Sequence, residues 1–110
     1  MDSYEIVMTP DAIDDLTELR NYIADVLLAP TAALNTVRAI RKEIADLSVF
    51  PAANRTMDEE PWHSRGLRRV QAKNFFIYYR IDEAGKRVYI LNIIYARRDQ
   101  LNALSENSKE

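Results

Sequence analysis

Residues 67–96, LRRVQAKNFFIYYRIDEAGKRVYILNIIYA, decide the fold of this 110-residue chain. Side chains along residues 67–72 alternate between two faces, and residues 75–81 are mainly aromatic or β-branched; both patterns are typical of β-strands. Residues 82–86 contain a glycine near their end and predict a tight turn. Residues 88–96 form the most apolar run, and we expect them to be a central strand buried on both faces. The stretch therefore predicts three strands in a meander.

The chain before this stretch predicts one further strand and two helices. A short strand is expected at residues 4–8, and Thr9-Pro10 then offers a cap and a favourable first helical residue. Apolar residues recur at helical spacing over residues 13–27 and again over residues 33–47, with a short proline-containing break between them. Two amphipathic helices joined so closely predict an antiparallel hairpin.

This segment order predicts a single α+β domain. The expected order is β-α-α-β-β-β, with the helical hairpin packed on one face of a mainly antiparallel four-stranded sheet. We expect the domain to cover residues 1–104, with Leu101 and Leu104 closing the core. Residues 105–110 are expected to form a frayed C-terminal tail.

The composition limits where the chain works. It contains no cysteine and only two glycines, which excludes disulfides, thiolate metal sites and glycine-rich phosphate loops. Its first residues lack the basic start and long apolar run of a signal peptide. No stretch approaches the roughly 18 apolar residues that span a bilayer. We therefore expect a cytoplasmic protein without a membrane partner.

The net charge of −2 hides an uneven distribution. Residues 1–60 carry a net charge of −7, whereas residues 61–104 carry +6. The acidic side chains are expected mostly on the helices and the basic ones mostly on the sheet. A basic face of this kind can attract an anionic partner. Two ordinary solvated faces of opposite sign are the alternative interpretation.

Several motifs, taken in order along the chain, resemble those of the RelE/ParE superfamily of toxins from bacterial type II toxin–antitoxin systems. The resemblance covers residues 4–101, and it is carried by Thr9-Pro10 with Asp15-Leu16, Phe50-Pro51, GLRRV at 66–70, KNFFIYYR at 73–80 and IYARRD at 94–99. The superfamily fold implied by this resemblance agrees with the architecture expected from the residues.

The resemblance implies two kinds of activity and two kinds of partner. RelE-like toxins are small ribonucleases that cut messenger RNA on the ribosome, whereas ParE-like toxins share the fold and poison DNA gyrase. Both kinds are silenced by an antitoxin. The expected partners are therefore a small acidic antitoxin and either ribosome-bound mRNA or DNA gyrase.

Cleavage of RNA by its own 2′-hydroxyl needs a base, a proton donor and cations around the phosphate, but no metal or other cofactor. Arginine suits the phosphate because its guanidinium is planar and permanently charged. Adjacent strand residues point in opposite directions, so only one of Arg68 and Arg69 can join a given site. The candidate catalytic residues are Lys73, Arg80 and Arg97. The candidate target-binding residues are Arg68, Arg69, Tyr79, Tyr95 and Arg98, and Asp99 is the expected partner that orients an arginine.

The positions of Lys73 and Arg97 favour a metal-independent mRNA endonuclease that acts on the ribosome. The alternative is a ParE-like gyrase poison without nuclease activity. It rests on the middle of the 75–81 strand, which lacks the arginine usual in RelE-like nucleases, and on the absence of tyrosine or histidine after Tyr95. The single histidine, His63, is expected to be an ordinary surface residue.

Overall fold

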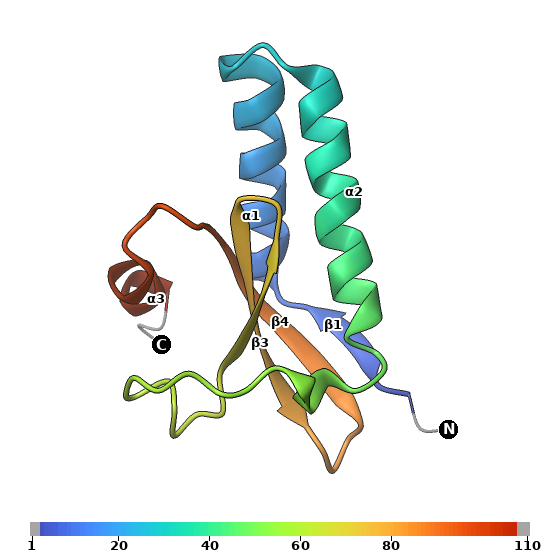
Figure 1. Ribbon diagram of the computed structural model, residues 1–110, viewed down its shortest axis with the longest axis vertical. Helices are drawn as coiled ribbons and strands as arrows, with labels where there is room; N and C mark the ends of the chain where they lie inside the picture. Colours follow the sequence, from blue (N-terminus) through green and yellow to red (C-terminus); the bar gives the residue numbers. More distant parts are fainter. Residues whose placement is uncertain (1–2, 108–110) are drawn as a thin grey trace.

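A four-stranded mixed sheet forms the centre of the molecule (Figure 1). The computed structural model describes residues 3–107. The strands are β1 (Glu5–Met8), β2 (Arg68–Ala72), β3 (Phe75–Asp82) and β4 (Arg87–Tyr95), in the spatial order β1-β4-β3-β2. Strands β2, β3 and β4 form an antiparallel meander, while β1 pairs with β4 in parallel. The predicted α+β class and the mainly antiparallel sheet are confirmed.

The helical hairpin covers one face of the sheet. It consists of α1 (Pro10–Asn21), which continues as the π-helical turn η1 (Tyr22–Val26), and α2 (Pro30–Asp46). The predicted start of α1 is confirmed, because Thr9 Oγ1 accepts a hydrogen bond from the Ala12 amide at 3.3 Å. The same hydroxyl donates to the carbonyl of Ile90 at 2.7 Å and so ties the helix start to β4.

A left-handed residue ends the first arm of the hairpin. Leu28 has a φ of 53° and is 81% exposed. The amide of Ala29 donates to the carbonyl of Ile23, six residues back, at 3.0 Å. The bond spans one residue more than the corresponding bond of a Schellman motif, because this arm ends in a π-helical turn, and glycine is the usual residue at such a left-handed helix stop. The chain reverses direction here without the glycine that normally marks such a stop in a sequence.

The opposite face of the sheet is covered by a second layer that the sequence did not predict in full. Helix α3 (Gln100–Asn107) and the long segment that follows the 3-10 turn η2 (Pro51–Ala53) pack there. Leu104 is buried as expected, whereas Leu101 is partly exposed. Residues 105–107 were expected in a frayed tail but continue α3, and residues 108–110 lie outside the described residues.

Two layers on one sheet explain why β4 is buried on both faces, as predicted. Val88, Ile90 and Ile93 pack against the helical hairpin, whereas Ile94 packs with the second layer. The register between β3 and β4 shifts at Leu91, because Tyr78 lies opposite Asn92 and Tyr79 opposite Ile90. Such a bulge bends the strand locally. No helix within residues 3–107 is long and apolar enough to cross a membrane.

Candidate functional site

Some predicted site residues meet at one end of the sheet. Lys73, with a φ of 55°, occupies the turn between β2 and β3. The amide of Ala96 donates to the carbonyl of Asn74 at 2.8 Å, which brings the exit of β4 beside this turn. Lys73, Tyr95 and Arg98 line a groove of about 850 Å³ against the helical hairpin. Arg97 follows in the exposed turn after β4.

Arg80 lies at the other end of the sheet. Lys73 precedes β3, and Arg80 lies five residues beyond the first residue of that strand, Phe75, which corresponds to about 17 Å at roughly 3.3 Å per residue. The register partner of Arg80 is Tyr89, six residues before Tyr95. The three residues predicted to be catalytic therefore do not form one site: Lys73 and Arg97 share one end of the sheet, and Arg80 lies at the other.

The paired arginines of β2 point to opposite faces, as predicted. Arg68 faces the helical side, and its Nη1 donates to the carbonyl of Asn54. Arg69 faces the other side, where its guanidinium carbon lies 4.1 Å from the centre of the Phe76 ring. Tyr79 was expected to contact a target but is fully buried, and its hydroxyl donates to the carbonyl of Pro51 at 2.6 Å. Its side chain belongs to the core because it lies opposite Ile90 on the face covered by the helices.

The expected role of Asp99 is also corrected. Its carboxylate accepts from the amide of Asn102 at 3.3 Å and so caps α3, as acidic residues commonly do at helix starts. Arg98 pairs instead with Glu106 at 2.9 Å, one helix length further on. Gln100 then fixes the same region, because its amide nitrogen donates to the carbonyls of Tyr95 and Arg98, each at 2.7 Å.

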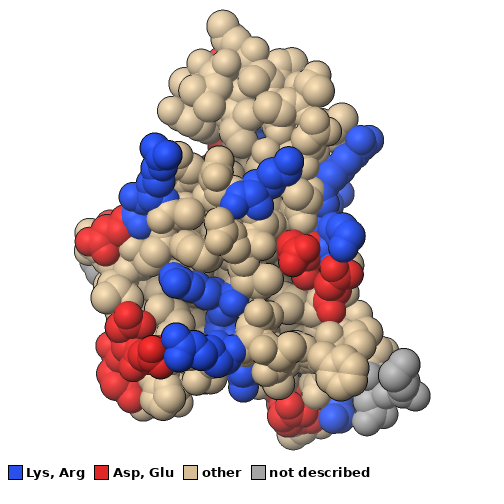
Figure 2. Space-filling model, in the orientation of Figure 1, with Lys and Arg blue, Asp and Glu red and all other residues tan. Residues whose placement is uncertain are grey.

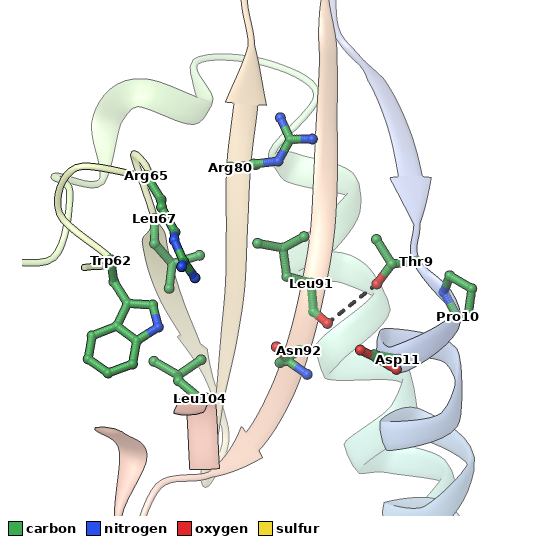
Figure 3. A pocket seen from close by; sticks show the side chains of 10 residues that line it. All are labelled: Thr9, Pro10, Asp11, Trp62, Arg65, Leu67, Arg80, Leu91, Asn92 and Leu104. Carbon is green, nitrogen blue, oxygen red and sulfur yellow. Dashed lines mark hydrogen bonds between the residues drawn. The ribbon is translucent and has the colours of Figure 1, made fainter. Parts of the chain in front are cut away.

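A hollow of about 730 Å³ lies on the side of the sheet opposite the helical hairpin (Figure 3). We call it the Arg65–Arg80 hollow. It is lined by Thr9, Pro10, Asp11, Trp62, Arg65, Leu67, Arg80, Leu91, Asn92 and Leu104. These residues come from the start of α1, the loop before β2, strands β3 and β4, and helix α3. The covering segments rather than the sheet alone therefore create the hollow.

Two arginines give this hollow its positive charge. Arg65 and Arg80 are both exposed, and within residues 3–107 neither guanidinium contacts a carboxylate. Arg80 is held in place because its guanidinium carbon lies 4.4 Å from the centre of the Tyr89 ring. The loop that carries Arg65 is anchored by buried Trp62 and by the bond from the Leu67 amide to the Trp62 carbonyl at 3.0 Å.

The wall of the hollow formed by β4 contains a buried polar pair. Asn92 is 6% exposed, and its amide nitrogen donates to Asp15 Oδ2 at 3.3 Å. The same oxygen accepts from the backbone amide of Ile93 at 2.9 Å. Burial raises the pKa of Asp15 above its ordinary value, the Ile93 and Asn92 hydrogen bonds lower it, and Glu18 and Asp11 raise it further.

Sequence reasoning missed Trp62, Arg65 and Asn92 as lining residues. Asn92 did carry a signal, because it is the single amide within a run of apolar residues, and a buried amide requires a hydrogen-bond partner. No sequence signal marked Arg65 as a lining residue, since its position depends on a long loop without hydrophobic periodicity. His63 is exposed, as expected, and its Nδ1 donates to the carbonyl of Met57 at 2.8 Å.

The basic side chains do not form one continuous patch. Figure 2 shows them spread across the middle of the face opposite the helical hairpin, with acidic side chains beside them. The tip of the hairpin, at the top of the same view, shows few charged side chains on this face, although exposed Asp25 belongs to its π-helical turn. Its exposed apolar side chains are Tyr22, Val26, Leu27, Leu28 and Leu34.

Comparison with solved structures places this architecture among known toxins. The chromosomal ParDE system of P. aeruginosa matches with a TM-score of 0.71 and 23% identity, over 88% of this chain and 100% of that one. The toxin–antitoxin complex RelBE2 of Mycobacterium tuberculosis gives 0.61 and 22%, over 84% and 98%. A mutant of the E. coli toxin RelE in the free state gives 0.62 and 11%, over 92% of each chain. At these identities the likeness shows a shared fold.

Comparison of the sequence with family profiles identifies the family to which the chain belongs. These solved structures have the fold that the RelE/ParE motifs predicted. A family profile described as ParE toxin of type II toxin-antitoxin system, parDE, matches residues 6–100. The chain therefore belongs to the ParE toxin family. A search of curated protein sequences gives no match.

Proposed function

We propose that this toxin arrests growth by binding and poisoning DNA gyrase in the cytoplasm rather than by cutting messenger RNA. The observation that carries the proposal is the separation of the candidate catalytic cations. Lys73 and Arg97 lie at one end of the sheet and Arg80 toward the other, about 17 Å along β3 from its first residue. One scissile phosphate cannot be held by all three.

The two buried tyrosines of β3 are not available for proton transfer. In-line cleavage needs a base and an acid within hydrogen-bond reach of the same phosphate. The hydroxyl of Tyr79 donates to Pro51, that of Tyr78 donates to Gln100 at 2.8 Å, and both tyrosine rings are buried. Tyr78 and Tyr79 therefore cannot serve as the base or the acid, which leaves exposed Tyr95 beside Lys73 in the groove.

The tip of the helical hairpin supports a protein target. A patch of exposed apolar side chains is typical of protein contact surfaces, and one exposed acidic residue, Asp25, lies beside this patch. Val26 is 64% exposed and Leu34 is 50% exposed at this tip. RNA, whose backbone is charged throughout, gains little from such a surface.

Gyrase assays test the proposal. Purified toxin, gyrase, ATP and relaxed plasmid should accumulate cleaved DNA that is revealed by detergent and protease. The double variant Val26→Ser/Leu34→Ser should need at least tenfold more protein for the same cleavage, because it removes apolar contact area. Val49→Ser is the matched control, since Val49 is exposed at the other end of the hairpin. Supercoiling that stays normal at a large excess of toxin would contradict the proposal.

The mRNA endonuclease remains the second candidate, and one observation favours it. On the face opposite the hairpin, the Arg65–Arg80 hollow offers two guanidinium groups that have no carboxylate partner within residues 3–107. Primer extension on reporter mRNA during toxin expression distinguishes the two activities. Intact transcripts in arrested cells support the gyrase proposal. Ribosome-dependent cuts that disappear in Arg97→Ala or Arg80→Ala would replace it.

The proposal includes an acidic antitoxin as the physiological partner. The similar structures from P. aeruginosa and M. tuberculosis are toxin–antitoxin systems. Co-expression of this chain with the product of the neighbouring short reading frame should restore growth and yield a stable complex. Continued arrest together with failed co-purification would remove that gene product as the antitoxin.

A further inference from the structure

The two ends of the Arg65–Arg80 hollow differ in chemistry. Figure 3 shows both arginines in its upper part, whereas Asn92 and Asp11 lie in its lower part. The floor is apolar, since Leu104 and Trp62 contribute to it and both are buried in the second core layer. A ligand that fits the hollow therefore carries negative charge at one end and hydrogen-bond donors at the other, with a flat or apolar part between or beside them.

We infer that this hollow binds a free nucleoside diphosphate or triphosphate, with the phosphates on Arg65 and Arg80 and the base on the apolar floor beside Asn92. The inference goes beyond the proposed function, because poisoning of gyrase requires no nucleotide on the toxin itself. The volume of about 730 Å³ suits such a ligand, since pockets for small organic molecules measure roughly 300–1,000 Å³.

The arginine end is prepared for phosphate. Guanidinium groups bind phosphate oxygens through two parallel hydrogen bonds, and neither arginine has a carboxylate partner among residues 3–107. Stacking of Arg80 on Tyr89, with 4.4 Å between the guanidinium carbon and the ring centre, holds that guanidinium before any ligand arrives. This lowers the entropy lost on binding. Two arginines favour a ligand with at least two phosphate groups over a monophosphate.

The other end offers acceptors for a base and a ribose. The Asn92 side chain donates its N–H to Asp15 at 3.3 Å, and no described residue donates to its carbonyl oxygen. That oxygen suits an amino or ring N–H group of a base. The Asp11 carboxylate has no cationic partner in the described chain, and acidic side chains commonly accept from ribose hydroxyls in nucleotide sites. Because Asp11 repels phosphate, the ligand is oriented with its phosphates toward the arginines.

This division of charge favours a free nucleotide over an RNA strand. Each internal nucleoside of RNA has a phosphate on both sides, so one phosphate would lie at the end that holds Asp11. The described residues that line the hollow include no third lysine or arginine to receive it. A nucleoside 5′-diphosphate or 5′-triphosphate carries all of its negative charge at one end, as the hollow requires.

Titration of the full-length chain with ADP, GDP, CDP and UDP tests the inference. Trp62 is the only tryptophan in the chain and lines the hollow, so its fluorescence reports binding there, and calorimetry gives the affinity. At least one diphosphate should bind tenfold or more tightly than its own nucleoside and than inorganic pyrophosphate, because each of these probes fills one end only. Pyrophosphate that binds as tightly as every nucleotide would overturn the inference, as would the absence of binding by all four nucleotides.

Variants then locate the binding site. Arg65→Ala and Arg80→Ala should each weaken binding of the tightest diphosphate at least tenfold and leave the weaker binding of its nucleoside unchanged, a difference that misfolding would not produce. Arg38→Ala is the matched control, because Arg38 is an exposed arginine on α2, the element covering the other face. Both hollow arginines are exposed, and circular dichroism checks that each variant is folded. Unchanged affinity for the diphosphate in both folded variants would overturn the inference.

A twelve-nucleotide single-stranded RNA serves as the competing probe. Diphosphate binding that survives an excess of this RNA supports the inference. RNA that binds more tightly than every diphosphate, and that loses affinity in Arg65→Ala and Arg80→Ala, would make the hollow a nucleic-acid site and overturn it. These titrations contain neither gyrase nor an antitoxin, so their outcome is independent of the proposed function.

Discussion

Asp15 shows how one carboxylate can hold a helix on a sheet. Strand β1 ends at Met8, so the next amides along the same edge of β4 have no strand partner on that side. One oxygen of Asp15 accepts from the Ile93 amide at 2.9 Å and from the Asn92 side chain at 3.3 Å. The carboxylate therefore replaces the missing strand for the Ile93 amide and also binds the Asn92 side chain.

Substitution of Asp15 should separate hydrogen bonding from charge. Asp15→Ala leaves the Ile93 amide without an acceptor and should lower the free energy of unfolding by about 1–3 kcal/mol. Asp15→Asn should cost much less, because a single amide oxygen can accept both bonds. Urea unfolding of both variants gives the comparison, with exposed Asp14→Ala as the control. Equal losses in the two Asp15 variants would contradict this role.

The raised pKa of Asp15, caused first by burial, also gives a pH dependence. A raised pKa means that the folded state holds the proton more tightly than the unfolded chain. The contribution of Asp15 to stability is therefore largest below its ordinary pKa of about 3.9 and falls as the pH rises through the folded value. The free energy of unfolding of the wild type should fall relative to that of Asp15→Asn over this interval and then stay parallel to it. A gap that widens in the opposite direction would contradict the prediction.

The burial and the structural roles of single residues were the hardest features to predict from the sequence. Burial of Tyr79 and exposure of Arg80 follow from strand alternation, but the bulge at Leu91 changes which β4 residues oppose them. The capping role of Asp99 had a sequence signal, because an acidic residue precedes the start of α3. Its neighbour Arg98 suggested an ion pair instead. Local spacing cannot distinguish the two roles without the helix that follows.

At the scale of elements, the stop of the first helical arm offers a sharp test. Leu28 adopts a left-handed backbone at φ 53°, which costs an L-residue roughly 1–2 kcal/mol. Leu28→Gly should raise the free energy of unfolding by about 0.5 kcal/mol, since the greater flexibility of glycine in the unfolded chain offsets part of the gain. Leu27→Gly is the control and should lower it by about 1 kcal/mol, because Leu27 is right-handed. A loss of stability in Leu28→Gly would contradict this account.

Helix α3 depends on a short hydrogen-bonded chain at its start. Arg69 donates to the Tyr78 hydroxyl at 3.3 Å, and that hydroxyl donates to Gln100 at 2.8 Å. Tyr78→Phe should lower the free energy of unfolding by about 0.5–1.5 kcal/mol and speed amide hydrogen exchange in α3. Tyr22→Phe is the control, since Tyr22 is exposed at the hairpin tip. Unchanged exchange in α3 would show that this chain does not secure the helix.

Helices and strands followed from the sequence where periodicity was long. The two arms of the hairpin and the three strands of the meander have many apolar positions each, so the pattern decides them. Helix α3 has eight residues and follows the IYARRD motif, in which charge obscured its few apolar positions. The left-handed stop at Leu28 was invisible because leucine stands where glycine is expected. The Arg65–Arg80 hollow depends on both α3 and a long loop, and so it could not be predicted.

At the scale of the whole molecule, the division of basic charge limits RNA binding. The cations lie at separate ends of the sheet and in separate hollows, with acidic side chains between them (Figure 2). Only about two or three should contact one RNA strand at a time, which predicts a slope of about −2 in a plot of log K against log salt concentration. Filter binding of a twenty-nucleotide RNA measures it. A slope of −4 or steeper would indicate a continuous basic surface instead.

The parallel pairing of β1 with β4 determines when a newly synthesised chain can complete its sheet. The first strand pairs with a partner 82 residues later, as the contact between Glu5 and Arg87 shows. At about 5–20 residues per second, ribosomes need roughly 4–16 seconds to make the chain between them. Until β4 has been synthesised, β1 has no strand to pair with. The sheet of a nascent chain thus stays incomplete for most of its synthesis.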